Sequence, residues 1–251
     1  MNWKQIVLLA AEQVRVLLYP RRCPFCGEVL GFQTSCADCQ PELDRLKLQV
    51  PRLPKSEHCM DYLSGAASVY RYDGCVREGI LKMKNGGQIA SAKEVGVWMA
   101  IVIFGCTFHQ HRGIIELDSG PIMRQFDVIV PVPNNKERDY SLPERLARQL
   151  GWALGIPVKK DALKKARVVQ QQKGKTAKQR MENAKDAYRV DCAEEIDGKR
   201  VLLVDDIITT GATISNCAKA LRKAGALDVF AVSIAETQFD EVLSKQEAFL
   251  E

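Results

Sequence analysis

The stretch Val201-Leu-Leu-Val-Asp-Asp-Ile-Ile-Thr-Thr-Gly-Ala-Thr213 decides the fold of this chain. Its four leading apolar residues predict a buried parallel strand, which ends in two adjacent carboxylates, Asp205 and Asp206. The loop Thr209-Thr210-Gly211-Ala212-Thr213 follows and leads into a helical pattern that Gly225 closes. The backbone N–H groups and dipole at a helix N-terminus favour an anion, whereas two carboxylates suit sugar hydroxyls or the water shell of Mg²⁺. The stretch therefore predicts a site for a phosphorylated sugar.

The same stretch resembles the signature of type I phosphoribosyltransferases, which bind 5-phosphoribosyl-1-pyrophosphate (PRPP). The alternative is an ordinary Rossmann-like turn whose two acids cap a helix, but Asp-Asp followed by Thr-Thr-Gly-Ala-Thr is uncommon in such turns. The resemblance implies that the loop from Thr209 to Thr213 holds the 5-phosphate. It also implies that Asp205 and Asp206 contact the ribose hydroxyls and that Mg²⁺ binds together with PRPP.

Length and composition are those of an ordinary globular protein. The 251 residues are 46% hydrophobic and 27% charged, which allows one sizeable α/β core and a small accessory module. The apolar run at the N-terminus is short and no plausible cleavage site follows, so a signal peptide is not expected. The apolar segment from Val95 to Phe108 is shorter than the roughly 20 residues of a membrane-spanning helix, and it predicts a buried core helix. We therefore expect no membrane span and a cytoplasmic location.

Four of the nine cysteines form two Cys-x-x-Cys pairs, Cys23 with Cys26 and Cys36 with Cys39. In a cytosolic chain such pairs favour a metal over disulfides, and together they supply the four thiolates of a tetrahedral structural zinc site. Gly27 follows the first pair, where a tight knuckle needs a permissive backbone. A redox pair is the alternative, but neither motif has the βαβ context of a redox site. The sequence predicts one structural Zn²⁺.

The other cysteines and one histidine are expected to have structural roles. We expect His58 to be an exposed linker histidine rather than an additional metal ligand. The remaining cysteines are expected to be small apolar core residues, at Cys59, Cys75, Cys106, Cys192 and Cys217.

The order of patterns along the chain predicts four segments. An amphipathic helix over 1–19 precedes a zinc ribbon over 20–45. A linker with two prolines, 46–60, then leads to a phosphoribosyltransferase-like domain over 61–251.

Strands and helices are expected to alternate in the large domain, which implies a parallel sheet with ligands at its carboxyl edge. Ser141 and Glu144 predict a capping box at a helix start. The expected strands, besides 201–204, lie at 66–72, 126–130 and 228–235. The expected helices lie at 76–83, 141–154 and 214–224.

Positive charge is concentrated between Lys159 and Arg189, where 11 lysines and arginines stand against three acids. The local net charge of +8 exceeds the +5 of the whole chain. One interpretation is a solvated helical face, and the other is a site for a polyanion such as nucleic acid or a pyrophosphate-bearing substrate. The residues leave both open, because Tyr188 is the only aromatic side chain in the stretch that could stack on a base.

Nearly the whole chain resembles the ComF family of competence-associated proteins, since a zinc ribbon precedes the phosphosugar loop. The segment from Asp127 to Pro133 matches the strand and loop that face the pyrophosphate in phosphoribosyltransferases, and the resemblance places Pro131 and Val132 at the ligand. Further residues match family positions without an assigned role, namely Lys82, Arg167, Gln172, Arg180 and Asn183.

The segment after Pro133 departs from the family pattern. ComF proteins usually carry a basic run and an Arg-Gly-Phe-Asn-Gln element there, whereas the segment from Asn134 to Glu144 is shorter and lacks that element. The missing arginine and glutamine would be polar contacts near the ligand. Lys136 and Arg138 are the residues here that can partly replace them.

Three functions are compatible with these patterns. The resemblance to ComF implies DNA uptake or processing in natural transformation, with PRPP and Mg²⁺ bound and with single-stranded DNA or an uptake protein as partner. The second is an active phosphoribosyltransferase, in which Mg²⁺ and cationic groups stabilise the departing pyrophosphate while Asp205 and Asp206 hold the reacting sugar. The third is a PRPP-responsive binding module without chemistry. No segment is recognisable as a hood for an acceptor base, so the sequence does not choose among them.

Overall fold

The computed structural model describes residues 20–30, 36–54, 58–85, 91–111, 114–119, 125–134, 141–166 and 187–237. The helix predicted over 1–19 lies outside these ranges. The strands and helices expected in the large domain all form, within a few residues of their predicted ends.

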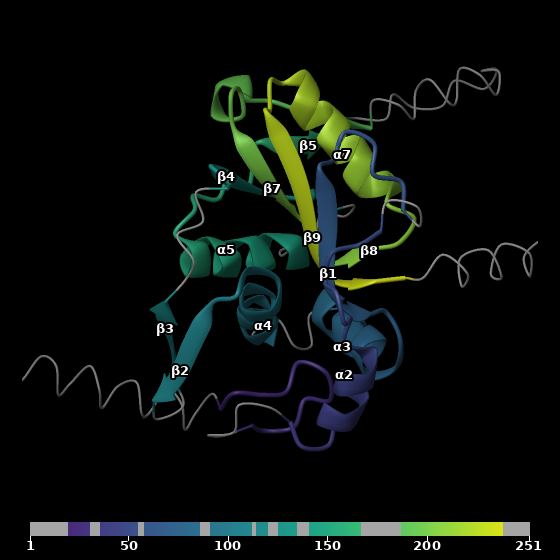
Figure 1. Ribbon diagram of the computed structural model, residues 1–251, viewed down its shortest axis with the longest axis vertical. Helices are drawn as coiled ribbons and strands as arrows, with labels where there is room; N and C mark the ends of the chain where they lie inside the picture. The colour runs from purple at the N-terminus through teal and green to yellow at the C-terminus, as the bar shows by residue number, and fades with distance from the viewer. Residues whose placement is uncertain are drawn as a thin grey trace, which may run out of the picture.

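A parallel sheet occupies the centre of the molecule, with its strands in the order β1-β9-β7-β4 (Figure 1). The short strand β8 also pairs with β9, and all pairings between these named strands are parallel. The predicted α/β fold with a parallel sheet is confirmed. The strands are β1 (Gly65–Arg71), β4 (Val128–Pro131), β7 (Arg200–Val204), β8 (Ile207–Ile208) and β9 (Asp228–Glu236).

Helices cover both faces of the sheet. Alternate strand residues such as Leu202 and Val232 pack in one cluster with α3, α4 and α5, while Leu203 and Ala231 pack in a second cluster with α7. This double burial explains why the central strands read as continuous apolar runs. The helices are α3 (Gly74–Lys84), α4 (Ala92–Phe104), α5 (Leu142–Leu154) and α7 (Ala212–Lys223).

Two helix ends follow local signals. Ser141 Oγ accepts a hydrogen bond of 3.4 Å from the Glu144 N–H at the start of α5, which is one half of the predicted capping box, whereas Glu144 Oε1 accepts from Arg148. The core helix predicted over 95–108 ends earlier, at Phe104, because Gly105 adopts a left-handed conformation (φ 68°) and stops it. The residues beyond Gly105 instead form strand β2 (Thr107–His111), which pairs antiparallel with β3 (Ile114–Ser119). No helix in the part of the chain that the structure describes is long and apolar enough to cross a membrane.

The cysteine-rich segment, residues 20–30 and 36–46, packs directly on the large domain. It contains a short helix, α2 (Gln40–Leu46), and its Phe25 ring stacks on Trp98 of α4 with centroids 5.6 Å apart. Arg21 donates two hydrogen bonds of 2.8 Å to the Glu94 carboxylate, and both side chains are about nine-tenths buried. The cysteine-rich segment therefore shares a hydrophobic core with the sheet.

The segment predicted as a linker runs along the sheet edge in its first half. Lys47 and Arg52 form antiparallel bridges to β1, and the Leu53 N–H donates to the Ala66 carbonyl at 2.9 Å. Leu53 is buried in the second cluster. The segment boundaries remain a prediction, but these contacts tie 47–53 to the large domain.

Gly79 of α3 is where the cysteine-rich segment comes closest to that helix. A Cβ atom at Gly79 would lie 2.8 Å from both the Phe25 Cα and the Pro24 carbonyl oxygen, so backbone would have to move. We expect Gly79→Ala to lower the free energy of unfolding by about 1–3 kcal/mol through overpacking. Denaturant titration measures the change. Glu78→Ala, at an exposed position of the same helix, is the control and is expected to stay within about 0.5 kcal/mol of wild type. Equal stability of both variants would contradict the close packing.

Candidate functional site

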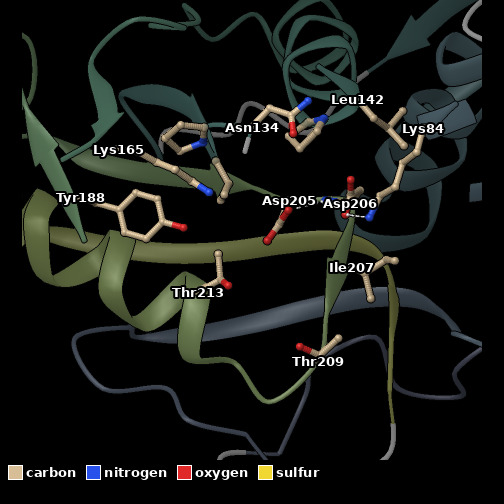
Figure 2. A pocket seen from close by; sticks show the side chains of 13 residues that line it. Lys84, Asn134, Leu142, Lys165, Tyr188, Asp205, Asp206, Ile207, Thr209 and Thr213 are labelled. Carbon is tan, nitrogen blue, oxygen red and sulfur yellow. Dashed lines mark hydrogen bonds and ion pairs between the residues drawn. The ribbon is translucent and has the colours of Figure 1, made fainter. Parts of the chain in front are cut away.

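A cavity of about 390 Å³ opens at the carboxyl end of β7 (Figure 2). Its wall is built by the ends of β4 and β7, the N-termini of α5 and α7, the C-terminus of α3, and an antiparallel pair of short strands. These two strands are β5 (Leu163–Lys165) and β6 (Tyr188–Val190), which pack on α7. Ligands of parallel α/β sheets bind at this edge, so the cavity lies where the fold favours a site.

The predicted phosphate loop lies at one side of the cavity. Thr209 and Thr213 line it, whereas Thr210, Gly211 and Ala212 complete the turn behind them. Gly211 has φ 80° and immediately precedes the first residue of α7. Hydroxyl groups and a helix N-terminus thus face the same space, which suits a phosphate.

A short segment, residues 58–61, contacts the predicted phosphate loop on the side away from the cavity. The Cys59 N–H donates to the Thr210 carbonyl at 2.9 Å, and Ser215 Oγ donates to the Asp61 carbonyl at 3.0 Å. A Cβ atom at Gly211 would lie 2.4 Å from the Cys59 carbonyl oxygen, so only glycine fits at this turn. The turn that faces the cavity is therefore held by residues about 150 positions earlier in the chain.

Two expectations for this neighbourhood were wrong. His58 is buried rather than exposed, and its Nε2 lies 3.4 Å from Glu236 Oε2 at the end of β9. Cys59 is exposed rather than packed in the core, while Cys75 and Cys192 are partly exposed. The other two cysteines outside the pairs, Cys106 and Cys217, are buried as expected.

The predicted acidic pair lies in the floor of the cavity. Asp205 and Asp206 are 8% and 9% exposed, and the Asp206 N–H donates to Asp205 Oδ1 at 2.8 Å. Burial and the neighbouring Asp206 charge raise the pKa of Asp205 to about 7. Burial also raises the pKa of Asp206, and the Lys84 ammonium group, 2.8 Å from Asp206 Oδ1, opposes that rise. Two buried carboxylates beside one cation are suited to accept hydrogen bonds from sugar hydroxyls.

Several cavity residues were missed by sequence reasoning, namely Lys84, Asn134, Leu142, Pro143, Lys165 and Tyr188. Lys165 Nζ lies 5.7 Å from the centre of the Tyr188 ring, and burial lowers the pKa of Lys165 and raises that of Tyr188. Both residues belong to the basic stretch, but their spacing in the sequence contains no signal that the two strands pair.

The remaining predicted residues divide into three groups. Val132 lines the cavity, and Pro131 ends β4 directly before it. Lys82 is not among the lining residues, because its Nζ donates to the Phe25 carbonyl at 3.3 Å beside the cysteine cluster. The rest lie outside the described ranges, namely Lys136, Arg138, Arg167, Gln172, Arg180 and Asn183.

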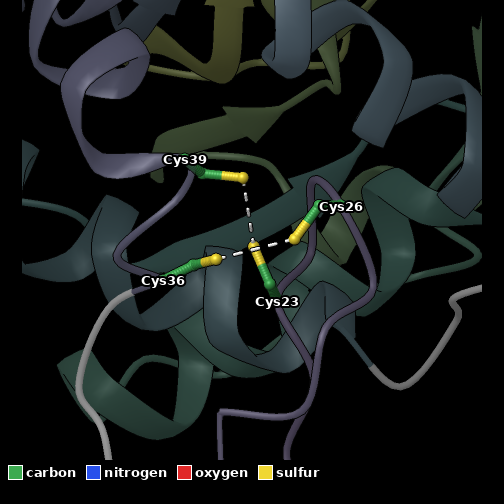
Figure 3. A group of neighbouring side chains, drawn as sticks. All are labelled: Cys23, Cys26, Cys36 and Cys39. Atoms are coloured by element: carbon green, nitrogen blue, oxygen red, sulfur yellow. Dashed lines mark hydrogen bonds between the residues drawn. The ribbon is translucent and has the colours of Figure 1, made fainter.

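The four paired cysteines come together as predicted (Figure 3). The sulfur atoms of Cys23, Cys26, Cys36 and Cys39 all lie within 4.8 Å of one another. The distance between the Sγ atoms of Cys23 and Cys39 is 3.8 Å, and that between the Sγ atoms of Cys26 and Cys36 is 3.6 Å. Tetrahedral Zn–S bonds of about 2.3 Å place sulfur atoms about 3.8 Å apart, so the cluster fits zinc. Gly27 has φ 93°, as the predicted knuckle requires.

Comparison with known families and proteins agrees with the geometry. The model of a family described as phosphoribosyl transferase domain matches residues 115–245. Competence protein F of Haemophilus influenzae is 35% identical over 108 residues, which are 41% of this chain and 47% of that protein. Competence protein ComFC of Bacillus subtilis is 25% identical over 203 residues, 81% of this chain and 72% of that protein. These matches, with the four-cysteine cluster, confirm the resemblance to the ComF family.

Other similarities are more limited in extent. The DNA utilization protein YhgH of Salmonella typhi is 29% identical over 107 residues, 41% of this chain and 46% of that protein. The chain thus spans about half the length of competence protein F and of YhgH. Among solved structures, glutamine PRPP amidotransferase from B. subtilis is 22% identical, with 62% of this chain and 32% of that chain covered and a TM-score of 0.39.

Proposed function

Because the chain belongs to the phosphoribosyl transferase domain family, we propose that its cavity binds PRPP together with Mg²⁺. The observation that carries this proposal is the meeting of Asp205 and Asp206 with the loop from Thr209 to Thr213 in one cavity. The loop hydroxyls and the start of α7 would hold the 5-phosphate, and the acidic pair would accept hydrogen bonds from the ribose hydroxyls. The turn after β4, at Val132, would face the pyrophosphate.

The residues of the cavity fit a magnesium-bound phosphosugar. Mg²⁺ prefers oxygen ligands and keeps part of its water shell. Buried carboxylates such as Asp205 and Asp206 can accept hydrogen bonds from those water molecules. Magnesium would neutralise charge on the pyrophosphate. Calorimetric titration with PRPP and Mg²⁺ tests the assignment, and saturable binding at one site per chain is expected. Absence of heat from wild-type protein at millimolar PRPP would contradict it.

Transfer of the phosphoribosyl group is a second candidate function. In such a reaction an acceptor nucleophile forms a bond to the anomeric carbon while the bond to the pyrophosphate oxygen breaks, and pyrophosphate leaves. Apolar side chains line the same cavity as the acidic pair, Leu142 and Pro143 at the start of α5 and Tyr188 on β6, and they favour this candidate because a planar acceptor can pack against them. A screen for pyrophosphate release with candidate acceptors separates a transferase from a PRPP-responsive binding module.

We also propose a role in DNA uptake or processing in the cytoplasm, with single-stranded DNA or an uptake protein as partner. The names of the relatives, competence protein and DNA utilization protein, support this role. Zinc in the cysteine cluster is part of the same proposal, since thiolate sites persist in a reducing compartment.

The described ends of the basic stretch carry paired charges. Lys164 Nζ lies 2.9 Å and Arg189 Nε 2.6 Å from Asp191 carboxylate oxygens, and Lys159 is paired with Glu195. A contact with nucleic acid would therefore depend mainly on the lysines and arginines within 167–186, which lie outside the described ranges.

Replacing Lys173, Lys175 and Lys178 together by Glu tests the DNA proposal. Each phosphate contact of a single strand contributes a slope of about −0.7 in log affinity against log salt. We expect the variant to bind single-stranded DNA more weakly and to lose about two units of that slope, while PRPP binding stays within about threefold. Titrations of a fluorescent oligonucleotide at several salt concentrations measure both quantities. If variant and wild type share one salt dependence, the basic stretch is a solvated surface.

A further inference from the structure

Lys84 is a cation of the cavity that neither the sequence patterns nor the family match assigns. It is the last residue of α3, and its side chain reaches across to the carboxyl end of β7 (Figure 2). The distance from its Nζ to Asp206 Oδ1 is 2.8 Å. The side chain of Asp206 is 12% exposed and that of Lys84 is 34% exposed, so the carboxylate is largely shielded from water and the lysine only in part. Partial shielding of this kind makes a charge contact stronger than at an open surface.

Titratable groups from four elements face the acidic pair, and two of these groups are charged. Lys84 projects from α3 and Lys165 from β5, whereas Tyr188 of β6 and Cys217 of α7 are neutral at physiological pH because burial raises the pKa of both. Lys84 forms the short ion pair with the acidic pair, and Lys165 acts on Asp205 through its charge. Two adjacent buried carboxylates repel each other, and a divalent cation is a common means of holding such a pair together.

We propose that Lys84 is a positioning residue that does the work of a divalent cation at Asp206, so that recognition of the sugar hydroxyls needs no Mg²⁺. Its ammonium group neutralises one carboxylate and fixes it at the cavity floor, where it can accept from a ribose hydroxyl. Magnesium is then required only where the ligand carries a pyrophosphate group. This inference rests on the proposed function of the cavity.

Ribose 5-phosphate separates the two requirements, because it has the sugar hydroxyls and the 5-phosphate but no pyrophosphate. Calorimetric titrations compare its affinity with and without millimolar Mg²⁺, in buffer without chelator so that the cysteine cluster keeps its metal. We expect the affinity of wild-type protein to change by less than about threefold between the two conditions. In Lys84→Met we expect the magnesium-free affinity to fall at least about tenfold, since a charge-assisted contact to a buried carboxylate is lost. Added Mg²⁺ is expected to restore most of it.

Two further variants distinguish a positioning role of Lys84 from a general effect on the stability of the fold. Lys84→Arg keeps the positive charge and is expected to retain binding without Mg²⁺. Lys93→Met removes the same charge at an exposed position of α4 that does not line the cavity, and it is expected to behave as wild type. A shift in magnesium dependence that follows the charge at residue 84 is not expected from a loss of stability alone, which thermal melting measures separately.

Each outcome decides the inference. Wild-type protein that binds ribose 5-phosphate only with Mg²⁺, or Lys84→Met that binds as wild type without it, would overturn the role of Lys84. If Lys84→Met does not fold, the magnesium independence of wild type and the retained binding of Lys84→Arg still test it. Failure of the proposed function has a different signature, because wild-type protein would then bind neither PRPP with Mg²⁺ nor ribose 5-phosphate under any condition.

Discussion

Replacing Asp205 and Asp206 together by Asn is expected to weaken PRPP binding at least about 100-fold. Two hydrogen bonds from ribose hydroxyls to charged acceptors are lost, and each such bond contributes about 1.5–3 kcal/mol. Calorimetric titration with PRPP and Mg²⁺ measures the loss. Asp161→Asn is the control, because Asp161 is exposed and does not line the cavity. This variant is expected to bind PRPP as wild type does.

The same double variant is expected to remain folded. Burial raises the pKa of both carboxyl groups, so in the folded protein they resist ionisation more than in the unfolded chain. A raised pKa means that the contribution of Asp205 to stability is present below its usual pKa and is lost as the pH rises through about 7. Uncharged Asn residues are free of this penalty, which offsets the loss of the ion pair between Asp206 and Lys84, and the free energy of unfolding at pH 8 is expected to fall by no more than about 2 kcal/mol. Tight PRPP binding by this variant would show that the acidic pair does not contact the sugar.

Loss of zinc is expected to have the largest effect on stability. Cys26→Ser removes one of the four thiolates, and metal binding to such a site is coupled to folding. We expect wild-type protein to contain one zinc per chain and Cys26→Ser to contain less than half of that. The free energy of unfolding should fall by at least about 4 kcal/mol, because loss of a metal is among the few changes with effects of that size. Metal analysis and denaturant titration measure the two quantities.

The destabilisation is not expected to stay within residues 20–45. Cys23, Phe25 and Leu43 lie in the same hydrophobic cluster as Ile80 of α3 and Val232 of β9. Loosening the cysteine-rich segment therefore exposes the face of the sheet that α3 and α4 cover. Cys192→Ser, which changes a cysteine outside the cluster, is the matched control. A wild-type protein with less than about half an equivalent of metal, purified with zinc present, would refute the site.

Local patterns predicted the parts of the molecule that depend on neighbouring residues. The strand, acidic pair, loop and helix from Val201 onward occupy their predicted places, since each element is specified within a few residues. The Ser141 cap spans three residues, and each cysteine knuckle is closed within a single turn. In all of these the interacting groups are close in sequence, so spacing determines geometry.

Contacts between distant segments were decided by the tertiary structure. Lys82 and Lys84 are two residues apart on α3, which turns about 200° over that distance, so they point in different directions. Lys82 donates to the cysteine-rich segment and Lys84 pairs with Asp206, more than 100 residues later. The burial of His58 against Glu236 likewise depends on β9 lying beside the segment that braces the phosphate loop.

The sequence by itself determined that this protein has a parallel α/β sheet, an acidic pair and a threonine- and glycine-containing loop at its carboxyl edge, and a four-cysteine cluster. Periodicity and short spacing carry that information, because they govern which backbone geometry each segment adopts. The tertiary structure alone decided which cations face the acidic pair, and that the cysteine cluster shares its core with the sheet. Those outcomes depend on how side chains from segments far apart pack at one place, and no pattern within a single segment records that packing.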